Sequence, residues 1–194
     1  MQKRKRLWQL GLFIICLAPF TYLVRRIVAN DLGPDPGQFV VVWLGWSALS
    51  MLFVTLSSAQ VSRWRPLSPL KKHRRLLGLT TFFYACCHML AMWAFILGRD
   101  IQALVVEIVE RPYITAGLAV VILLTPLALT SNQYSMRKLG RRWKTLHLLV
   151  YPAGALALVH YAWQLRGDWL LLGIFILWFA LLLLFKFVNK RNGR

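Results

Sequence analysis

Acidic residues are scarce in this sequence, with six Asp and Glu against 24 Lys and Arg among 194 residues. Charged residues make up 15% of the chain, whereas soluble domains carry roughly a quarter. Hydrophobic residues make up 58%. This balance argues against a soluble protein. A small transporter would need ionisable groups near the membrane midplane, and every carboxylate here lies outside the apolar segments.

Cysteine is also scarce, since the chain has only Cys16, Cys86 and Cys87, all within apolar segments. An odd number of cysteines in such segments provides no disulfide framework. The run Cys86-Cys87-His88 resembles a c-type haem attachment site, but the C-x-x-C-H motif needs a cysteine where Tyr84 stands. Any haem in this protein should therefore be held through its iron alone, which makes it b-type.

Long polar stretches are missing as well, because six apolar segments take up most of the chain. Apolar stretches of about 18 residues or more indicate transmembrane helices, and we place them at about 7–24, 39–59, 76–97, 114–130, 146–163 and 169–187. At about 20 residues each they use about 120 residues, which leaves no room for a soluble nucleotide-binding or catalytic domain. We expect an all-α integral membrane protein, a six-transmembrane-helix bundle forming a single domain over residues 1–194.

The basic residues are distributed unevenly between the two sides of this predicted bundle. Nineteen of the 24 fall before the first segment, between the second and third, between the fourth and fifth, or in the last nine residues of the chain. The positive-inside rule therefore places both termini in the cytoplasm. A nucleic-acid binder would need such charges on one folded face, so we expect no nucleic-acid partner. The first apolar segment is too long for a typical signal peptide and is expected to be retained.

Three of the four histidines lie in or at the ends of apolar segments, where an imidazole is a functional candidate by default. His147 and His160 are 13 residues apart on one segment, or roughly 20 Å along a helix. Pro152 and Gly154 lie between them and predict a kink. Histidines at two depths suggest stacked haems and electron transfer across the membrane.

With a cytoplasmic N-terminus, His88 and His160 both lie toward the outer face and are candidates for the two axial ligands of an outer haem. His147 lies near the inner face, with His73 as a candidate partner. Alternatives remain open at this point. His73 is equally explained as a solvated loop residue among Lys and Arg, and a membrane histidine can simply hydrogen-bond to a neighbouring helix. A zinc site is disfavoured, because it would gather four ligands at one place.

Two further features are ambiguous. The outer segment IQALVVEIVE has helical spacing of apolar residues and predicts an interfacial helix or a docking surface. Trp93, Tyr151, Tyr161 and Trp163 are placed near the outer site, where they pack on porphyrin or form an interfacial aromatic belt. We find no internal repeat.

The segments RRLLGLTTFFYACCHM, RPYITAGLAVVILLTPLALTS and RKLGRRWKTLHLLVYPAGALALVHYAW resemble one family over nearly the whole chain. It is the family of haem-binding membrane subunits of bacterial periplasmic methionine-sulfoxide reductases, within the ferric-reductase-like transmembrane superfamily. The resemblance implies that His88, His147 and His160 ligate haem b, one or two per chain, and that Arg74 occupies the position of a suggested inner ligand. It also implies FMN binding, although we find no flavin motif.

The resemblance further implies two partners. The electron acceptor is a periplasmic molybdopterin methionine-sulfoxide reductase (MsrP). The electron donor is either a cytoplasmic flavin reductase that uses NAD(P)H, or membrane quinol. We therefore expect an electron-transfer subunit that carries no catalytic residues itself. The alternatives are a self-contained ferric reductase or oxidase, a small transporter, and a structural anchor that would leave the histidines unexplained.

Overall fold

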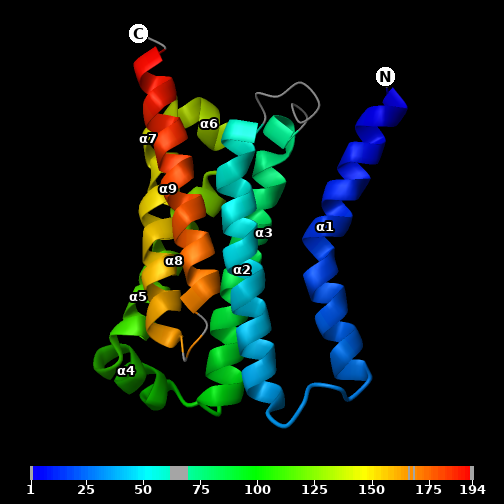
Figure 1. Cartoon of the computed structure of the whole chain (residues 1–194), viewed down its shortest axis with the longest axis vertical. Coiled ribbons are helices and arrows are strands. Elements are labelled where there is room, and N and C mark those ends of the chain that lie inside the picture. The colour runs from blue at the N-terminus through cyan, green and yellow to red at the C-terminus, as the bar shows by residue number, and fades with distance from the viewer. Residues whose placement is uncertain (1, 62–69, 166, 168, 193–194) are drawn as a thin grey trace. The chain divides into compact units, whose positions relative to one another are not determined.

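The computed structural model describes residues 2–61, 70–165, 167 and 169–192, and nearly all of these residues are helical (Figure 1). Within these ranges six helices are long and apolar enough to cross a membrane, and their bounds are Gln9–Val28, Pro36–Ser58, His73–Ile96, Pro112–Leu129, Arg141–Gln164 and Trp169–Val188. The prediction of six spans in an all-helical chain is confirmed. The chain is a multi-pass membrane protein.

The chain divides into two compact units, Met1–Leu104 and Val105–Arg194. The first contains α1 (Gln2–Val28), α2 (Pro36–Val61) and α3 (Leu70–Ala91), which continues into a π-helical turn at Met92–Ile96. The α2 and α3 helices pack along each other more extensively than any other pair. Their shared core contains buried Val40, Leu44, Met51, Tyr84 and Ala91, with Leu23 from α1.

The α1 helix runs through Pro19, and a side chain from α3 bonds to the helix backbone there. Pro19 has no N–H to donate. The next N–H, that of Phe20, donates to the Tyr84 hydroxyl at 3.1 Å, and this hydroxyl donates to the Cys16 carbonyl at 2.7 Å. The hydroxyl thus stands between two backbone groups that a regular helix would join directly. Trp43 of α2 adds a second link by donating from Nε1 to the Pro19 carbonyl at 2.9 Å.

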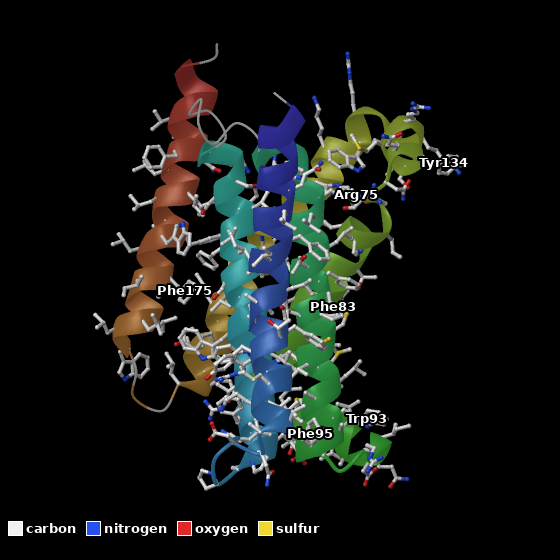
Figure 2. All side chains as sticks on the ribbon, turned by 90° about the vertical axis from the view of Figure 1, so that its right-hand side faces the viewer. Arg75, Phe83, Trp93, Phe95, Tyr134 and Phe175 are labelled. Carbon is white, nitrogen blue, oxygen red and sulfur yellow. The ribbon has the colours of Figure 1, made fainter. Side chains whose placement is uncertain are left out.

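The second unit begins within α4 (Ile101–Glu110) and continues through α5 (Pro112–Leu129), α6 (Gln133–Leu139), α7 (Arg141–Leu146), a 3-10 turn at His147–Leu149, α8 (Val150–Gln164) and α9 (Trp169–Asn192). The main helix pair of this unit is α5 with α8, and α9 packs beside α8. The Tyr134 side chain points away from the short helix α6 (Figure 2) and is 71% exposed. Many large apolar side chains of α9 are also exposed, as expected for a helix that faces lipid.

One local detail differs from the sequence-based expectation. The fifth span begins at Arg141, and its irregular turn lies at His147–Leu149 rather than at Pro152. Pro152 instead occupies the first turn of α8, where a missing N–H breaks no helical hydrogen bond. The structure therefore places the irregular backbone at the histidine itself. The segment IQALVVEIVE forms a helix, α4, as predicted, and it has no buried residue.

Candidate functional site

His88 lies on α3 with its ring held against the backbone of α2. Its Nδ1 atom is 2.8 Å from the Val41 carbonyl oxygen. One helical turn after Val41 stands Gly45, and a Cβ at that glycine would lie only 3.0 Å from both Cε1 and Nδ1 of His88. The carbonyl and the glycine therefore define a cradle that fits the imidazole edge.

His160 lies on α8 in a cradle of the same design on α5. Its Nδ1 atom is 2.6 Å from the Tyr113 carbonyl oxygen. A Cβ at Gly117, again one turn after the carbonyl, would lie 2.9 Å from Cε1 and Nδ1 of the ring. We call these two arrangements the His88 cradle and the His160 cradle.

The two cradles form an internal repeat that sequence reasoning missed. In both, the histidine follows its carbonyl partner by 47 residues, and the glycine follows that carbonyl by four. The sequence shows no obvious repeat here, because a carbonyl carries no side-chain signature and helical glycines are common in membrane proteins. The signal was a Gly-to-His spacing of 43 residues that occurs twice.

The cradles determine which ring nitrogen can serve as a ligand. An imidazole that donates from Nδ1–H to a carbonyl carries its lone pair on Nε2, and this arrangement is the usual one for metal-bound histidine. Within the ranges that the structure describes, no three His, Cys, Asp or Glu side chains gather as a bare metal ion would require. Single imidazoles with oriented Nε2 atoms suit the axial positions of haem iron, which needs few protein ligands.

His147 has different, more local surroundings. It starts the 3-10 turn, its Nδ1 lies 3.1 Å from the Trp143 carbonyl, and its ring stacks on Trp143 with centroids 3.9 Å apart. Trp143 in turn donates from Nε1 to the Thr130 carbonyl at the end of α5, at 3.0 Å. A tryptophan anchored to α5 thus orients this histidine.

The two other candidate ligands, His73 and Arg74, lie near the start of α3, far along the helix from His88. His73 is partly buried and Arg74 is exposed. Fourteen residues separate Arg74 from His88, which corresponds to roughly 21 Å of helix axis. The two therefore belong to a different depth from His88, as the two-level interpretation requires.

The four aromatic residues that we expected beside the outer site do not all lie there in the structure. Tyr151 lies one turn after His147, so its placement beside the outer site was wrong. Its ring receives the Lys186 ammonium, with Nζ 3.4 Å from the ring centroid. Tyr161 packs edge-on against Phe175 at 6.4 Å, and Trp163 is 57% exposed, as an interfacial residue would be. Trp93 lies in the π-helical turn beyond His88 (Figure 2).

The residues at the α4–α5 junction anchor the carbonyl of the His160 cradle. Arg111 forms an ion pair with Glu107 at 2.7 Å and donates to the Tyr113 hydroxyl at 3.0 Å. The hydrogen bond to Tyr113, with the nearby Glu107 carboxylate, raises the pKa of Arg111. Thr115 adds a bond to the Ile108 carbonyl. These contacts join the first turn of α5 to α4, so the Tyr113 carbonyl is presented by a braced backbone.

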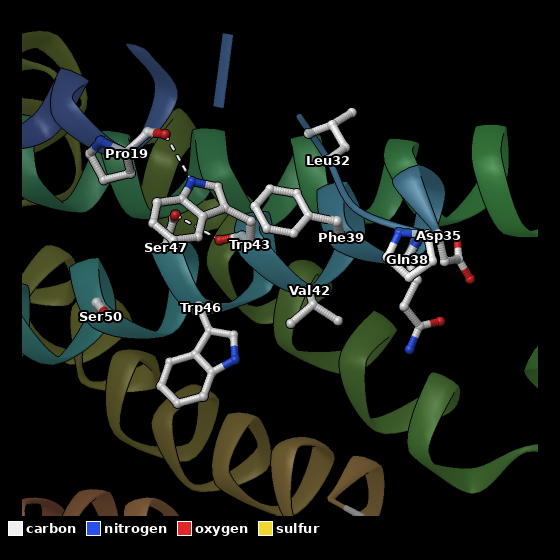
Figure 3. Close-up of a pocket in the computed structure, with 11 residues that line it drawn as sticks. Pro19, Leu32, Asp35, Gln38, Phe39, Val42, Trp43, Trp46, Ser47 and Ser50 are labelled. Atoms are coloured by element: carbon white, nitrogen blue, oxygen red, sulfur yellow. Dashed lines mark hydrogen bonds between the residues drawn. The ribbon is translucent and has the colours of Figure 1, made fainter. Parts of the chain in front are cut away.

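An open hollow of about 740 Å³ lies between α1, α2 and the turn that joins them (Figure 3). Its walls are mainly apolar and include Pro19, Phe39, Trp43 and Trp46, with Gln38 at one end. The Trp43 indole donates across it to Pro19 (Figure 3). The hollow lies at the end of α2 that follows the 30–35 turn, away from the basic 2–3 loop, and its lining suits hydrocarbon.

Comparison with known proteins shows which family this chain resembles. The family described as "Ferric reductase like transmembrane component" matches residues 42–159. The chain is also 36% identical over 200 residues to the protein-methionine-sulfoxide reductase heme-binding subunit MsrQ of Rhodospirillum rubrum, covering 100% of this chain and 96% of that protein. The family match contains Gly45, Gly117, His88 and His147, and it ends one residue before His160.

Proposed function

The chain belongs to the ferric reductase-like transmembrane family and, within it, to the MsrQ haem-binding subunits, and from this premise we propose that it is a b-type haem protein that relays electrons across a bacterial inner membrane. The observation that carries the proposal is the pair of matching cradles, each of which orients one intramembrane imidazole through Nδ1. Intramembrane histidines are seldom accidental, and two in equivalent settings fit one bis-imidazole iron.

His88 and His160 are the proposed axial ligands of an outer haem. A haem held by two imidazoles supplies one-electron transfer and offers no open iron position for substrate. The work of the protein is then to hold the ligands. The Val41 and Tyr113 carbonyls accept the Nδ1 protons, so each Nε2 keeps its lone pair for iron. The like construction of the two cradles gives the two ligands similar basicity.

An inner haem is proposed at His147, with Arg74 or His73 on α3 as the residue that completes its coordination. Trp143 fixes the ring of His147 by stacking and by its carbonyl. His147 and His160 are 13 residues apart, which separates the two levels by roughly 20 Å. Two haems stacked at this spacing would span most of a hydrocarbon core about 30 Å thick.

The direction of electron flow follows from the proposed topology, in which both termini are cytoplasmic. Electrons enter at the inner level from a cytoplasmic flavin reductase or from membrane quinol. They leave at the outer level to a periplasmic molybdopterin methionine-sulfoxide reductase, MsrP, which repairs oxidised envelope proteins. FMN is proposed only from family membership; the basic loops offer charge for a phosphate.

The first test is a reduced-minus-oxidised visible spectrum of the detergent-purified chain, with a pyridine haemochrome count. We expect a b-type spectrum and one or two haems per chain. His88→Ala and His160→Ala should each remove the same low-spin component, and His147→Ala should leave that component in place. A colourless protein from haem-sufficient cells would refute the proposal, and survival of the full bis-histidine signal in either outer variant would refute the pairing.

The second test separates a relay from a self-contained reductase. The reduced chain in liposomes is mixed with a ferric chelate, or with the periplasmic reductase and oxidised protein substrate. A relay should reoxidise rapidly only with the periplasmic enzyme present. Equal reoxidation by the chelate alone would favour the self-contained ferric reductase.

A further inference from the structure

Gly45 and Gly117 occupy the positions that decide whether the two histidines can reach their carbonyl partners. We propose that both glycines are positioning residues for haem ligation: without a Cβ they admit each imidazole edge to the helix backbone, and so orient Nε2 and keep the ligand electron-rich. This inference rests on the proposed haem function, and it assigns a role to residues that touch the ligands without touching the iron.

A side chain at either position would force the imidazole ring to move. A Cβ on Gly45 would lie 3.0 Å from Cε1 and Nδ1 of His88 and 3.6 Å from Nε2. A Cβ on Gly117 would lie 2.9 Å from Cε1 and Nδ1 of His160 and 3.5 Å from Cγ. Carbon atoms attract best at about 3.5–4.0 Å, so an alanine would push either ring away from its helix.

Gly78 and Gly173, which also lie in described helices, do not share this feature. A Cβ on Gly78 of α3 would meet only the Thr55 methyl carbon, at an ordinary 3.8 Å, and Gly173 of α9 has nothing within 4 Å. A Cβ on Gly37 would lie 3.1 Å from the Cβ of Phe95, but Phe95 is not a candidate ligand. Gly78 and Gly173 are therefore matched controls for the same Gly→Ala change in a membrane helix.

The consequence for the iron follows from the hydrogen bond that each glycine permits. Donation from Nδ1–H to a carbonyl raises the basicity of the other ring nitrogen and fixes the ring orientation. A more basic ligand stabilises ferric over ferrous iron. Displacing the ring weakens that bond, so the midpoint potential of the outer haem should rise. Gly117 should be the more sensitive position, because its Cβ contact is closer and the His160 bond is the shorter, at 2.6 Å against 2.8 Å.

The experiment compares Gly45→Ala and Gly117→Ala with Gly78→Ala, Gly173→Ala and wild type, each purified as the full chain in detergent. The readouts are haem per protein, the low-spin electron paramagnetic resonance signal, the midpoint potential from redox titration, and helix content by circular dichroism. We expect both cradle variants to keep wild-type helix content while the outer haem shifts to higher potential or is lost. The effect should be larger for Gly117→Ala, and both controls should match wild type.

Each other outcome has a definite meaning. If the cradle variants match Gly78→Ala in low-spin signal and potential, the positioning role is refuted. If Gly117→Ala loses its helix content, Gly45→Ala, with the milder contact, decides in the same way. If all five proteins, wild type included, lack haem, it is the proposed haem function that fails. A potential shift of equal size in Gly173→Ala would also overturn the inference, because that glycine contacts nothing within 4 Å.

Discussion

Tyr84→Phe removes a single hydroxyl that stands inside the hydrogen-bond ladder of another helix. Tyr84 is 1% exposed, and its hydroxyl both accepts from the Phe20 N–H and donates to the Cys16 carbonyl of α1. The variant therefore loses two interhelical hydrogen bonds at once while the ring and its packing remain. Interhelical bonds in membrane proteins average about 0.6 kcal/mol and reach about 1.7, so we expect a loss of about 1–3 kcal/mol.

The assay is reversible unfolding of the purified chain in mixed micelles, followed by circular dichroism, with Tyr134→Phe as the control. The Tyr134 side chain is 71% exposed, so loss of its hydroxyl should leave the free energy of unfolding within about 0.5 kcal/mol of wild type. If Tyr84→Phe unfolds like Tyr134→Phe, the two hydroxyl bonds to the α1 backbone do not stabilise the fold. A more stable variant would also refute the reasoning, because the Phe20 N–H would then reach the Cys16 carbonyl directly.

Three further predictions concern the second unit and the cofactor. Trp143→Leu should perturb the spectrum and potential of the inner haem and leave the outer low-spin signal unchanged, because Trp143 stacks on His147; a change confined to the outer signal would contradict this. Tyr151→Leu should lower the free energy of unfolding by about 0.5–2 kcal/mol, because it removes the contact with Lys186. Adding Lys186→Met to this variant should lower that free energy no further. Protein from haem-depleted cells should unfold at a lower temperature than haem-loaded protein and recover on adding haem, because a ligand bound only to the folded state stabilises it; equal melting temperatures would contradict haem binding.

The six membrane spans and the four histidines could be predicted from sequence because both signals are carried by residue type. A long run of apolar residues predicts a membrane span, and a histidine within such a run is a functional candidate. The bounds were predicted less well where backbone detail decides them, as at the fifth span, which begins at Arg141. Local hydrogen bonding there, with His147 directed at the Trp143 carbonyl, has no counterpart in composition.

The partners of His88 and His160 could not be predicted, because they are a backbone carbonyl and the absence of a side chain. Gly45 and Gly117 look like ordinary glycines of membrane helices until α3 and α8 are packed against α2 and α5. The role of Tyr84 could not be predicted either. In the sequence it is one more aromatic residue of an apolar segment, and only in the folded chain does its hydroxyl bond to the backbone of α1.

The sequence by itself determined that this chain spans a membrane, its helical class, its family and which side chains are candidate haem ligands, since each of these depends on residue type and order. Only the tertiary structure decided how the imidazoles of His88 and His160 are oriented. The physical reason is that a hydrogen bond to a backbone carbonyl, and the room left by a missing Cβ, depend on helix packing. In each cradle the carbonyl precedes the histidine by 47 residues and the glycine precedes it by 43.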